Sequence, residues 1–293
     1  MNSKKFALSL VAASTFALAA GQSQAADITN LDGTFGFSGF DWSKAGAILI
    51  DGYGITSASA PGTSDTFTLY YLATATGLFD QNGSPISNSL LPNLNPTGTG
   101  GGAATQYEYT IVAQINETAT CITAVGCTAV SISLDSGTWK AWYDVGPDAN
   151  YADGTGFTNG NLLLTGDFSG ALPVIAPQGP TNPGNITLGA TFFGQVLTTN
   201  SSFIVPDLNG TTASSTLQFG TGITQPFIVP TQFPTLVPSG FIATAPTGNT
   251  HYFGQADSNQ SFVTVPEPGS LALLGAILGA FGLIRRRQSG QSV

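Results

Sequence analysis

Hydrophobic and polar residues alternate along several stretches of the chain, and this period of two is typical of β-strands. In residues 107–115 the odd-numbered positions are tyrosine, isoleucine or alanine, whereas the even-numbered positions include Glu108, Thr110 and Gln114. Such a pattern predicts a strand with one buried face. The same alternation predicts strands over residues 66–73, 130–134 and 138–145.

Residues that favour turns separate these segments. Asp135, Ser136 and Gly137 lie between 130–134 and 138–145, and because glycine adopts positive φ easily, we expect a β-hairpin there. Further strands are expected over residues 161–168, 186–197 and 216–219. Many short strands with frequent turns predict an all-β protein, with an antiparallel β-sandwich or jelly-roll-like body.

The first 25 residues have the three parts of an export signal. Lys4 and Lys5 are positively charged, residues 6–20 are apolar, and a small-x-small pattern ends at Ala25. We therefore expect signal peptidase to cut between Ala25 and Ala26. The alternative is an uncleaved membrane anchor, which the short apolar run disfavours.

The C-terminus carries a second apolar run, residues 271–284, between a proline-flanked glutamate and a group of arginines. These flanking residues are Pro266, Glu267, Pro268, Arg285, Arg286 and Arg287. As a helix the run is about 21 Å long, short of the roughly 30 Å hydrocarbon core of a bilayer. We expect a short transmembrane helix that anchors the protein temporarily, with the arginines in the cytoplasm. A buried core helix is the alternative.

This order of tripeptide, apolar run and basic cluster resembles the PEP-CTERM sorting signal of Gram-negative bacteria, over residues 265–287. The resemblance implies that the membrane protease exosortase recognises the tripeptide and cuts near it. The protein would then be secreted to the cell surface or extracellular matrix. Signal peptidase, exosortase and, transiently, the inner membrane are the implied processing partners.

The expected domain organisation places a β-rich extracellular body at residues 26–246 and a polar spacer at 247–264, ahead of the sorting signal. Between Ala26 and Val265 the chain has fifteen acidic residues and two lysines, a formal net charge of −13. Proteins that bind nucleic acid neutralise its phosphates with basic patches. So acidic a body excludes nucleic acid as a partner.

Cys121 and Cys127 lie six residues apart, and the oxidising compartment outside the inner membrane favours a disulfide between them. Metal ligation is disfavoured because no histidine lies nearby.

The chain has a single histidine, His251, and it falls in the expected spacer, so neither a Ser-His-Asp triad nor a multi-histidine metal site is expected in the body. Two carboxylates alone could hydrolyse glycosides, but the sequence gives no sign of the shaped cleft that this chemistry needs. We therefore expect a protein that is not an enzyme and has no resident cofactor.

Two groups of residues are candidates for ligand contact. Asp144, Asp148, Asn150 and Asp153 resemble a calcium loop, although the EF-hand register fails at Asp153, where that motif needs glycine. A turn-rich loop is the favoured interpretation, and calcium binding is the alternative. Trp142 could stack on a sugar ring, although packing inside the protein is the favoured role for its indole.

Residues 35–42 and 142–166 are similar to flocculation-associated members of the PEP-CTERM group. This second resemblance implies a structural or adhesive role in flocs or biofilms, with exopolysaccharide or neighbouring cells as partners. The alternatives are a carbohydrate- or calcium-binding β-sandwich module and an uncharacterised hydrolase.

Overall fold

The computed structural model describes residues 26–97, 103–151, 154–177, 189–219 and 251–263, which fall in one compact unit, Ala25–Val263. These residues form antiparallel β-sheets with one short 3-10 turn, η1 (Asn88–Leu90), so the all-β class is confirmed. The largest sheet contains β3 (Gly39–Asp51), β4 (Ser64–Phe79), β5 (Tyr107–Cys121), β6 (Ala129–Val145), β7 (Asn161–Phe168), β8 (Gly170–Ala171), β9 (Val174–Pro177), β10 (Gly189–Thr199), β12 (Thr212–Phe219) and β13 (His251–Val263).

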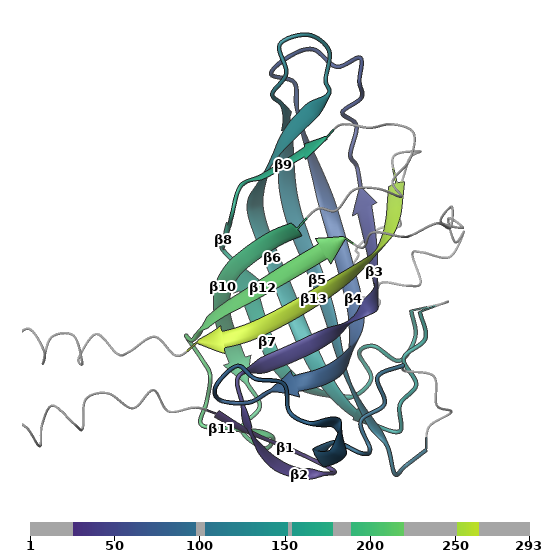
Figure 1. The fold of residues 1–293 in the computed structure, drawn as a ribbon, viewed down its shortest axis with the longest axis vertical. Coiled ribbons are helices and arrows are strands. Elements are labelled where there is room, and N and C mark those ends of the chain that lie inside the picture. Colours follow the sequence, from purple (N-terminus) through teal and green to yellow (C-terminus); the bar gives the residue numbers. More distant parts are fainter. Residues whose placement is uncertain (1–25, 98–102, 152–153, 178–188, 220–250, 264–293) are drawn as a thin grey trace, which may run out of the picture. The chain divides into compact units, whose positions relative to one another are not determined.

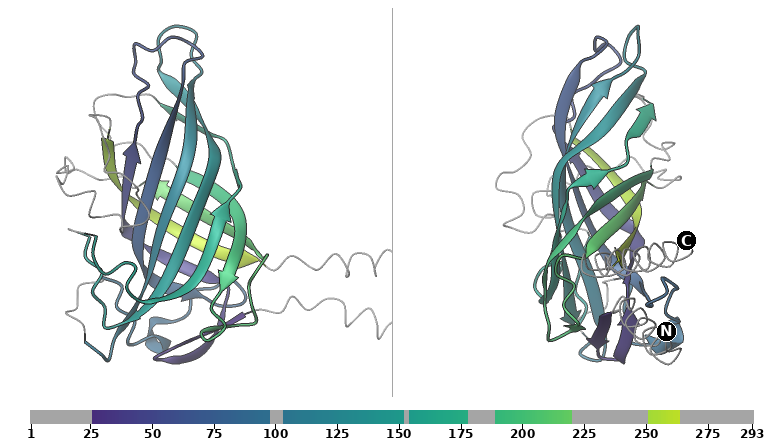
Figure 2. Two further views of the ribbon diagram at one scale, coloured as in Figure 1. Left: turned by 180° about the vertical axis from the view of Figure 1, so that it is seen from behind. Right: turned by 90° about the vertical axis from the view of Figure 1, so that its left-hand side faces the viewer.

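This ten-stranded sheet closes on itself, in place of the two packed sheets of a sandwich. Its order runs β12-β13-β3-β4-β5-β6-β7-β10, and β10 pairs in turn with β12. In Figure 1, β10, β12 and β13 cross in front of β4, β5 and β6. Figure 2 shows the long blue and teal strands side by side from behind. Because β10 and β12 pair, both ends of this ring of eight strands have a partner, which removes a site for aggregation.

Side chains that point inward from the closed sheet form the main hydrophobic core. The largest of those fully buried in it are aromatic: Trp42, Trp139, Tyr107, Tyr109, Phe40 and Phe192. Phe37, from the short strand Gly33–Phe37 that precedes β3, is also buried in this core. Phe40 stacks on Trp42 with ring centroids 4.7 Å apart, and Phe262 of β13 packs against Trp139 at 5.8 Å. Large rings therefore account for much of the apolar area that holds the strands together.

A second, three-stranded sheet lies at one end of the closed sheet and consists of β1 (Ala26–Asn30), β2 (Gly33–Phe37) and β11 (Ile204–Val205) (Figure 1). Three tyrosines of the main sheet bond to the β1–β2 turn. Tyr107 Oη donates to Asp32 Oδ2 at 2.9 Å, Asn30 Nδ2 donates to Tyr109 Oη at 3.0 Å, and the Leu31 amide donates to Tyr143 Oη at 3.1 Å. These bonds fix the N-terminal hairpin against the end of the core.

The hairpin expected at residues 135–137 is wrong, because β6 continues through them as a single strand. β5 pairs with β6 from Tyr107↔Val145 to Cys121↔Val130, so the partner strand is long enough to cover both predicted segments. Asn116 pairs with Ser136 and Glu117 pairs with Leu134, so Asp135 is the extra residue of a β-bulge. The true hairpin turn lies between Cys121 and Ala129.

The polar spacer expected at residues 247–264 is also wrong over 251–263, which form the strand β13 between β12 and β3. The body therefore extends to Val263 instead of ending at residue 246. Ala256, Ser258, Gln260 and Phe262 point inward and are at most 6 % exposed, whereas the residues between them are polar. Because most of the inward residues are small or polar, this segment lacks the alternation of hydrophobic and polar residues that predicts a strand.

In the part of the chain that the structure describes, no helix has the length and apolar character needed to span a bilayer. The expected signal peptide (1–25) and the expected C-terminal helix (271–284) lie outside the described residues.

Candidate functional site

The pairing of β5 with β6 places two carboxylates directly opposite each other on the outer face of the closed sheet. Glu108 of β5 and Asp144 of β6 are register partners, next to the pair Tyr107 and Val145, of which Tyr107 is buried in the main core. Like charges at opposite positions of neighbouring strands normally destabilise a sheet. Another interaction must therefore offset the repulsion between the Glu108 and Asp144 carboxylates.

The loop between β6 and β7 folds back over this outer face and buries part of it. Phe157 and Ala149 of the loop pack with Trp142, Leu72 and Val112 in a hydrophobic cluster separate from the main core. Thr110 Oγ1 donates to the Phe157 carbonyl at 2.7 Å, which ties the loop to β5. Glu108 lies beneath this loop and is 0 % exposed.

Two backbone amides of the loop hold the Glu108 carboxylate in place. Its Oε1 accepts from the amides of Asp148 at 2.9 Å and Ala149 at 3.0 Å. Its Oε2 is equally buried and has no hydrogen-bond partner among the described residues. Burial raises the pKa of Glu108 to about 7, and the charges of Asp148 and Asp144 add to that rise while the two amides oppose it.

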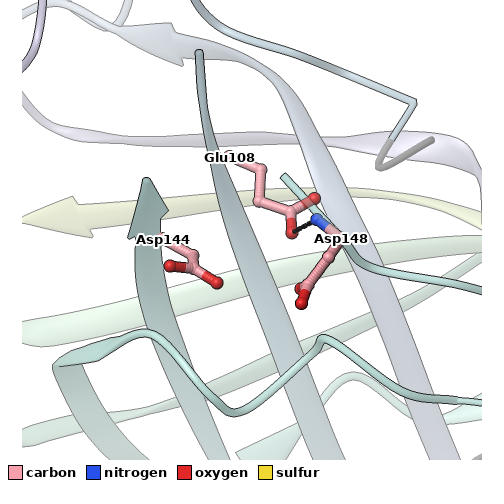
Figure 3. A group of neighbouring side chains, drawn as sticks. All are labelled: Glu108, Asp144 and Asp148. Carbon is pink, nitrogen blue, oxygen red and sulfur yellow. Dashed lines mark hydrogen bonds between the residues drawn. The ribbon is translucent and has the colours of Figure 1, made fainter. Parts of the chain in front are cut away.

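Asp148 completes a cluster of three carboxylates. One oxygen each from Glu108, Asp144 and Asp148 lies within 4.8 Å of the others, and Figure 3 shows the three side chains converging from β5, β6 and the loop. Glu108 is buried, Asp144 is partly buried and Asp148 is exposed, so the cluster opens to solvent on one side.

The neighbours of Asp144 and Asp148 shape this cluster further. Burial raises the pKa of Asp144, with a smaller rise from the charge of Asp148, while a bond from the Val145 amide lowers it. Asn159 Nδ2 donates to both oxygens of Asp148, at 3.2 and 2.9 Å. Three carboxylates at this spacing are oxygen ligands of the kind that hard divalent cations prefer.

The structure brings together only some of the residues proposed from the sequence. Asp144 and Asp148 meet, whereas Asn150 takes part in a backbone bridge with Thr155 and Asp153 lies outside the described residues. Trp142 is 7 % exposed and packed beneath the loop, so it does not present its ring to a glycan.

Glu108 is a residue of the cluster that the sequence alone does not indicate. It lies on the polar face of its predicted strand, and its role depends on its pairing with Asp144. The short segment between Cys121 and Cys127 is the sequence feature that indicates a hairpin. A hairpin at this point pairs residues 107–121 with 129–145 and so places Glu108 opposite Asp144.

The remaining predicted residues have separate places in the fold. The disulfide between Cys121 and Cys127 is confirmed and is part of a third buried cluster, with Ile55, Phe67 and Val130. His251 begins β13, where its backbone pairs with Asp51, instead of lying in a spacer. Ala26 is the first residue of β1, whereas Ala25 and the sorting residues lie outside the described residues: Pro266, Glu267, Pro268, Arg285, Arg286 and Arg287.

A family model, the PEP-CTERM protein-sorting motif, matches residues 264–288. No curated protein and no solved structure matches the chain. The match begins directly after β13 and includes the proline-flanked glutamate, the apolar run and the arginines. The motif marks a protein that exosortase processes and that Gram-negative bacteria export to the cell envelope or surface. The chain therefore carries a PEP-CTERM protein-sorting motif at residues 264–288.

Proposed function

We propose that the folded body is a structural and adhesive component of the extracellular matrix, acting together with exopolysaccharide in cell aggregation such as flocculation or biofilm formation. The observation that carries the proposal is the sorting motif at 264–288, joined directly to an all-β body that begins at Ala26. The proposed role is non-catalytic, and the resemblance of residues 35–42 and 142–166 to flocculation-associated proteins supports it.

The construction of the body also supports a structural role. The sheet closes on itself, large aromatic side chains are buried inside it, and a disulfide ties one end of the β5–β6 hairpin. A closed main sheet and a covalent cross-link suit a protein that must persist outside the cell. The net charge of −13 between Ala26 and Val265 favours association with neutral polymers, or with anionic ones through cations.

Deleting the gene and scoring aggregation of the cells tests the role. We expect smaller flocs or thinner biofilms, restored by the intact gene. A matched variant replaces Pro266, Glu267 and Pro268 with alanine, which leaves residues 26–263 unaltered and removes the residues that exosortase is expected to recognise. It should fail to restore aggregation. Unchanged flocs in the deletion strain would contradict the proposal.

Mass spectrometry of the surface protein tests its sorting separately. We expect a mature chain that starts at Ala26 and lacks the arginines at 285–287. A surface-exposed chain that still carries these arginines would show that the motif is not processed.

A calcium-binding module is the second candidate, and the acidic cluster of Glu108, Asp144 and Asp148 favours it. Calcium binding and the matrix role are compatible, because one protein can bind calcium and also be a structural component of the matrix.

A further inference from the structure

We propose that Glu108, Asp144 and Asp148 bind one calcium ion at the outer face of β5 and β6. The inference does not rest on the adhesive role, since it depends only on the geometry of the folded body. It names Glu108 as the central ligand, a residue outside the loop that the sequence pattern singled out.

The spacing of the carboxylates is compatible with one shared divalent cation. Their oxygens lie within 4.8 Å of one another. Oxygens bound to one Ca²⁺ at about 2.4 Å lie no more than about 4.8 Å apart. Calcium is the expected ion because it accepts irregular, carboxylate-rich oxygen coordination, whereas Mg²⁺ demands near-ideal octahedral geometry.

Glu108 provides the independent evidence that the cluster is a binding site. Its carboxylate is completely buried, and its Oε2 has no hydrogen-bond donor among the described residues. A buried carboxylate whose second oxygen has no donor is costly, and a cation shared with Asp144 and Asp148 would lower that cost by neutralising the charge of the carboxylate. The two amide bonds to Oε1 orient the carboxylate, as bonds to metal-ligating carboxylates commonly do.

The charges that act on the cluster are themselves negative. Among the described residues, Asp148 and Asp144 act on Glu108, and Asp148 acts on Asp144. A divalent cation between the strands would turn the repulsion of the Glu108–Asp144 pair into shared attraction.

The openness of the cluster sets the expected affinity. Asp148 is exposed, so water would fill the coordination positions that the three carboxylates leave. Extracellular calcium modules of this kind bind with Kd about 10⁻⁴ to 10⁻³ M. This range suits a protein that works outside the cell.

Calorimetric titration of the processed protein, recovered after export and treated with EDTA, tests the site. We expect one saturable CaCl₂ site with Kd about 10⁻⁴ to 10⁻³ M and a Tm that rises by several degrees at saturating calcium. No saturable heat up to 10-fold above this range would overturn the proposal. An equal response to MgCl₂ would overturn the assignment to calcium.

Three variants and a matched control locate the site. Asp148→Asn, Asp144→Asn and Glu108→Gln should each weaken calcium binding about 10-fold or more, and glutamine keeps an acceptor for the two loop amides. Asp207→Asn makes the same charge change at an exposed aspartate outside the cluster and should leave binding unchanged.

Equal weakening by Asp207→Asn would mean diffuse attraction to the acidic surface and would overturn the proposal. If Glu108→Gln does not fold, the Asp148→Asn variant tests the site instead. The Asp148 side chain is exposed, so it can change without disturbing the buried loop contacts. Unaltered affinity in Asp148→Asn would contradict the site.

Discussion

Glu117 is a carboxylic acid held inside the protein, and the nearby charge that acts on it is the like charge of Asp135. It lies on β5 between Phe67 and Leu134 and is 6 % exposed. Burial raises its pKa to about 8, and the charge of Asp135 adds to the rise. The folded protein therefore keeps a proton on Glu117 at pH values where the unfolded chain, with an ordinary glutamate pKa near 4.5, has released it.

This difference makes stability depend on pH. Because the folded state binds more protons, its free energy of unfolding should fall as pH rises from about 4.5 to 8, by an amount on the order of 3 kcal/mol. Glu108, with a pKa of about 7, contributes in the same direction. Urea unfolding at pH 5 and pH 8.5 measures the fall, which Glu117→Gln should reduce. A variant with the same pH profile as the wild type would contradict the assignment.

Gly166 of β7 lies opposite Trp139 of β6, and the missing side chain makes room for the buried indole. A Cβ at this position would overlap the ring of Trp139. We expect Gly166→Ala to lower the free energy of unfolding by about 1–3 kcal/mol, measured by urea denaturation. Gly170→Ala is the matched control, because a Cβ there meets nothing within 4 Å. Equal effects of the two changes would refute the packing argument.

At the scale of elements, β5 and β6 form the longest pairing of the sheet and carry both the carboxylate pair and the disulfide. Replacing Cys121 and Cys127 together with alanine removes a cross-link that closes a short loop. We expect a loss of about 2 kcal/mol in the free energy of unfolding. A reducing agent should lower the stability of the wild type by a similar amount and leave the variant unaffected, and unfolding in urea with and without dithiothreitol checks this.

Elements with clear alternation could be predicted from the sequence, and those without it could not. The expected strand at 161–168 coincides with β7, and the one at 107–115 lies within β5. β13 was missed because Ser258 and Gln260 occupy inward positions where apolar residues mark a strand. The sequence at Asp135 predicts a turn, although the structure has a β-bulge there, because the same residue types occur in turns and in bulges.

The candidate site was only half predictable for a related reason. Asp144 and Asp148 are close in the sequence, whereas Glu108 joins them only through the register of two strands. A shift of one residue would turn Glu108 to the other face of the sheet. Register depends on the packing of the whole sheet, which a local pattern does not contain.

At the scale of the whole molecule, β13 completes the closed sheet. Without it, β12 and β3 would each present a long unpaired edge. A protein that ends at residue 250 should therefore aggregate or lack fixed tertiary structure, whereas one that ends at residue 265 should fold. Size-exclusion chromatography and near-ultraviolet circular dichroism distinguish the two. A monomeric, folded protein without β13 would contradict this role of the strand.

The position of β13 at the end of the body also sets the timing of folding. A chain delivered from its N-terminus supplies the other described strands before β13. We therefore expect the emerging portion to remain incomplete and sensitive to protease until residues 251–263 are available. Chains stalled just before His251 should be digested, and chains stalled well past Val263 should resist, so maturation of the body and arrival of its sorting signal become nearly simultaneous events.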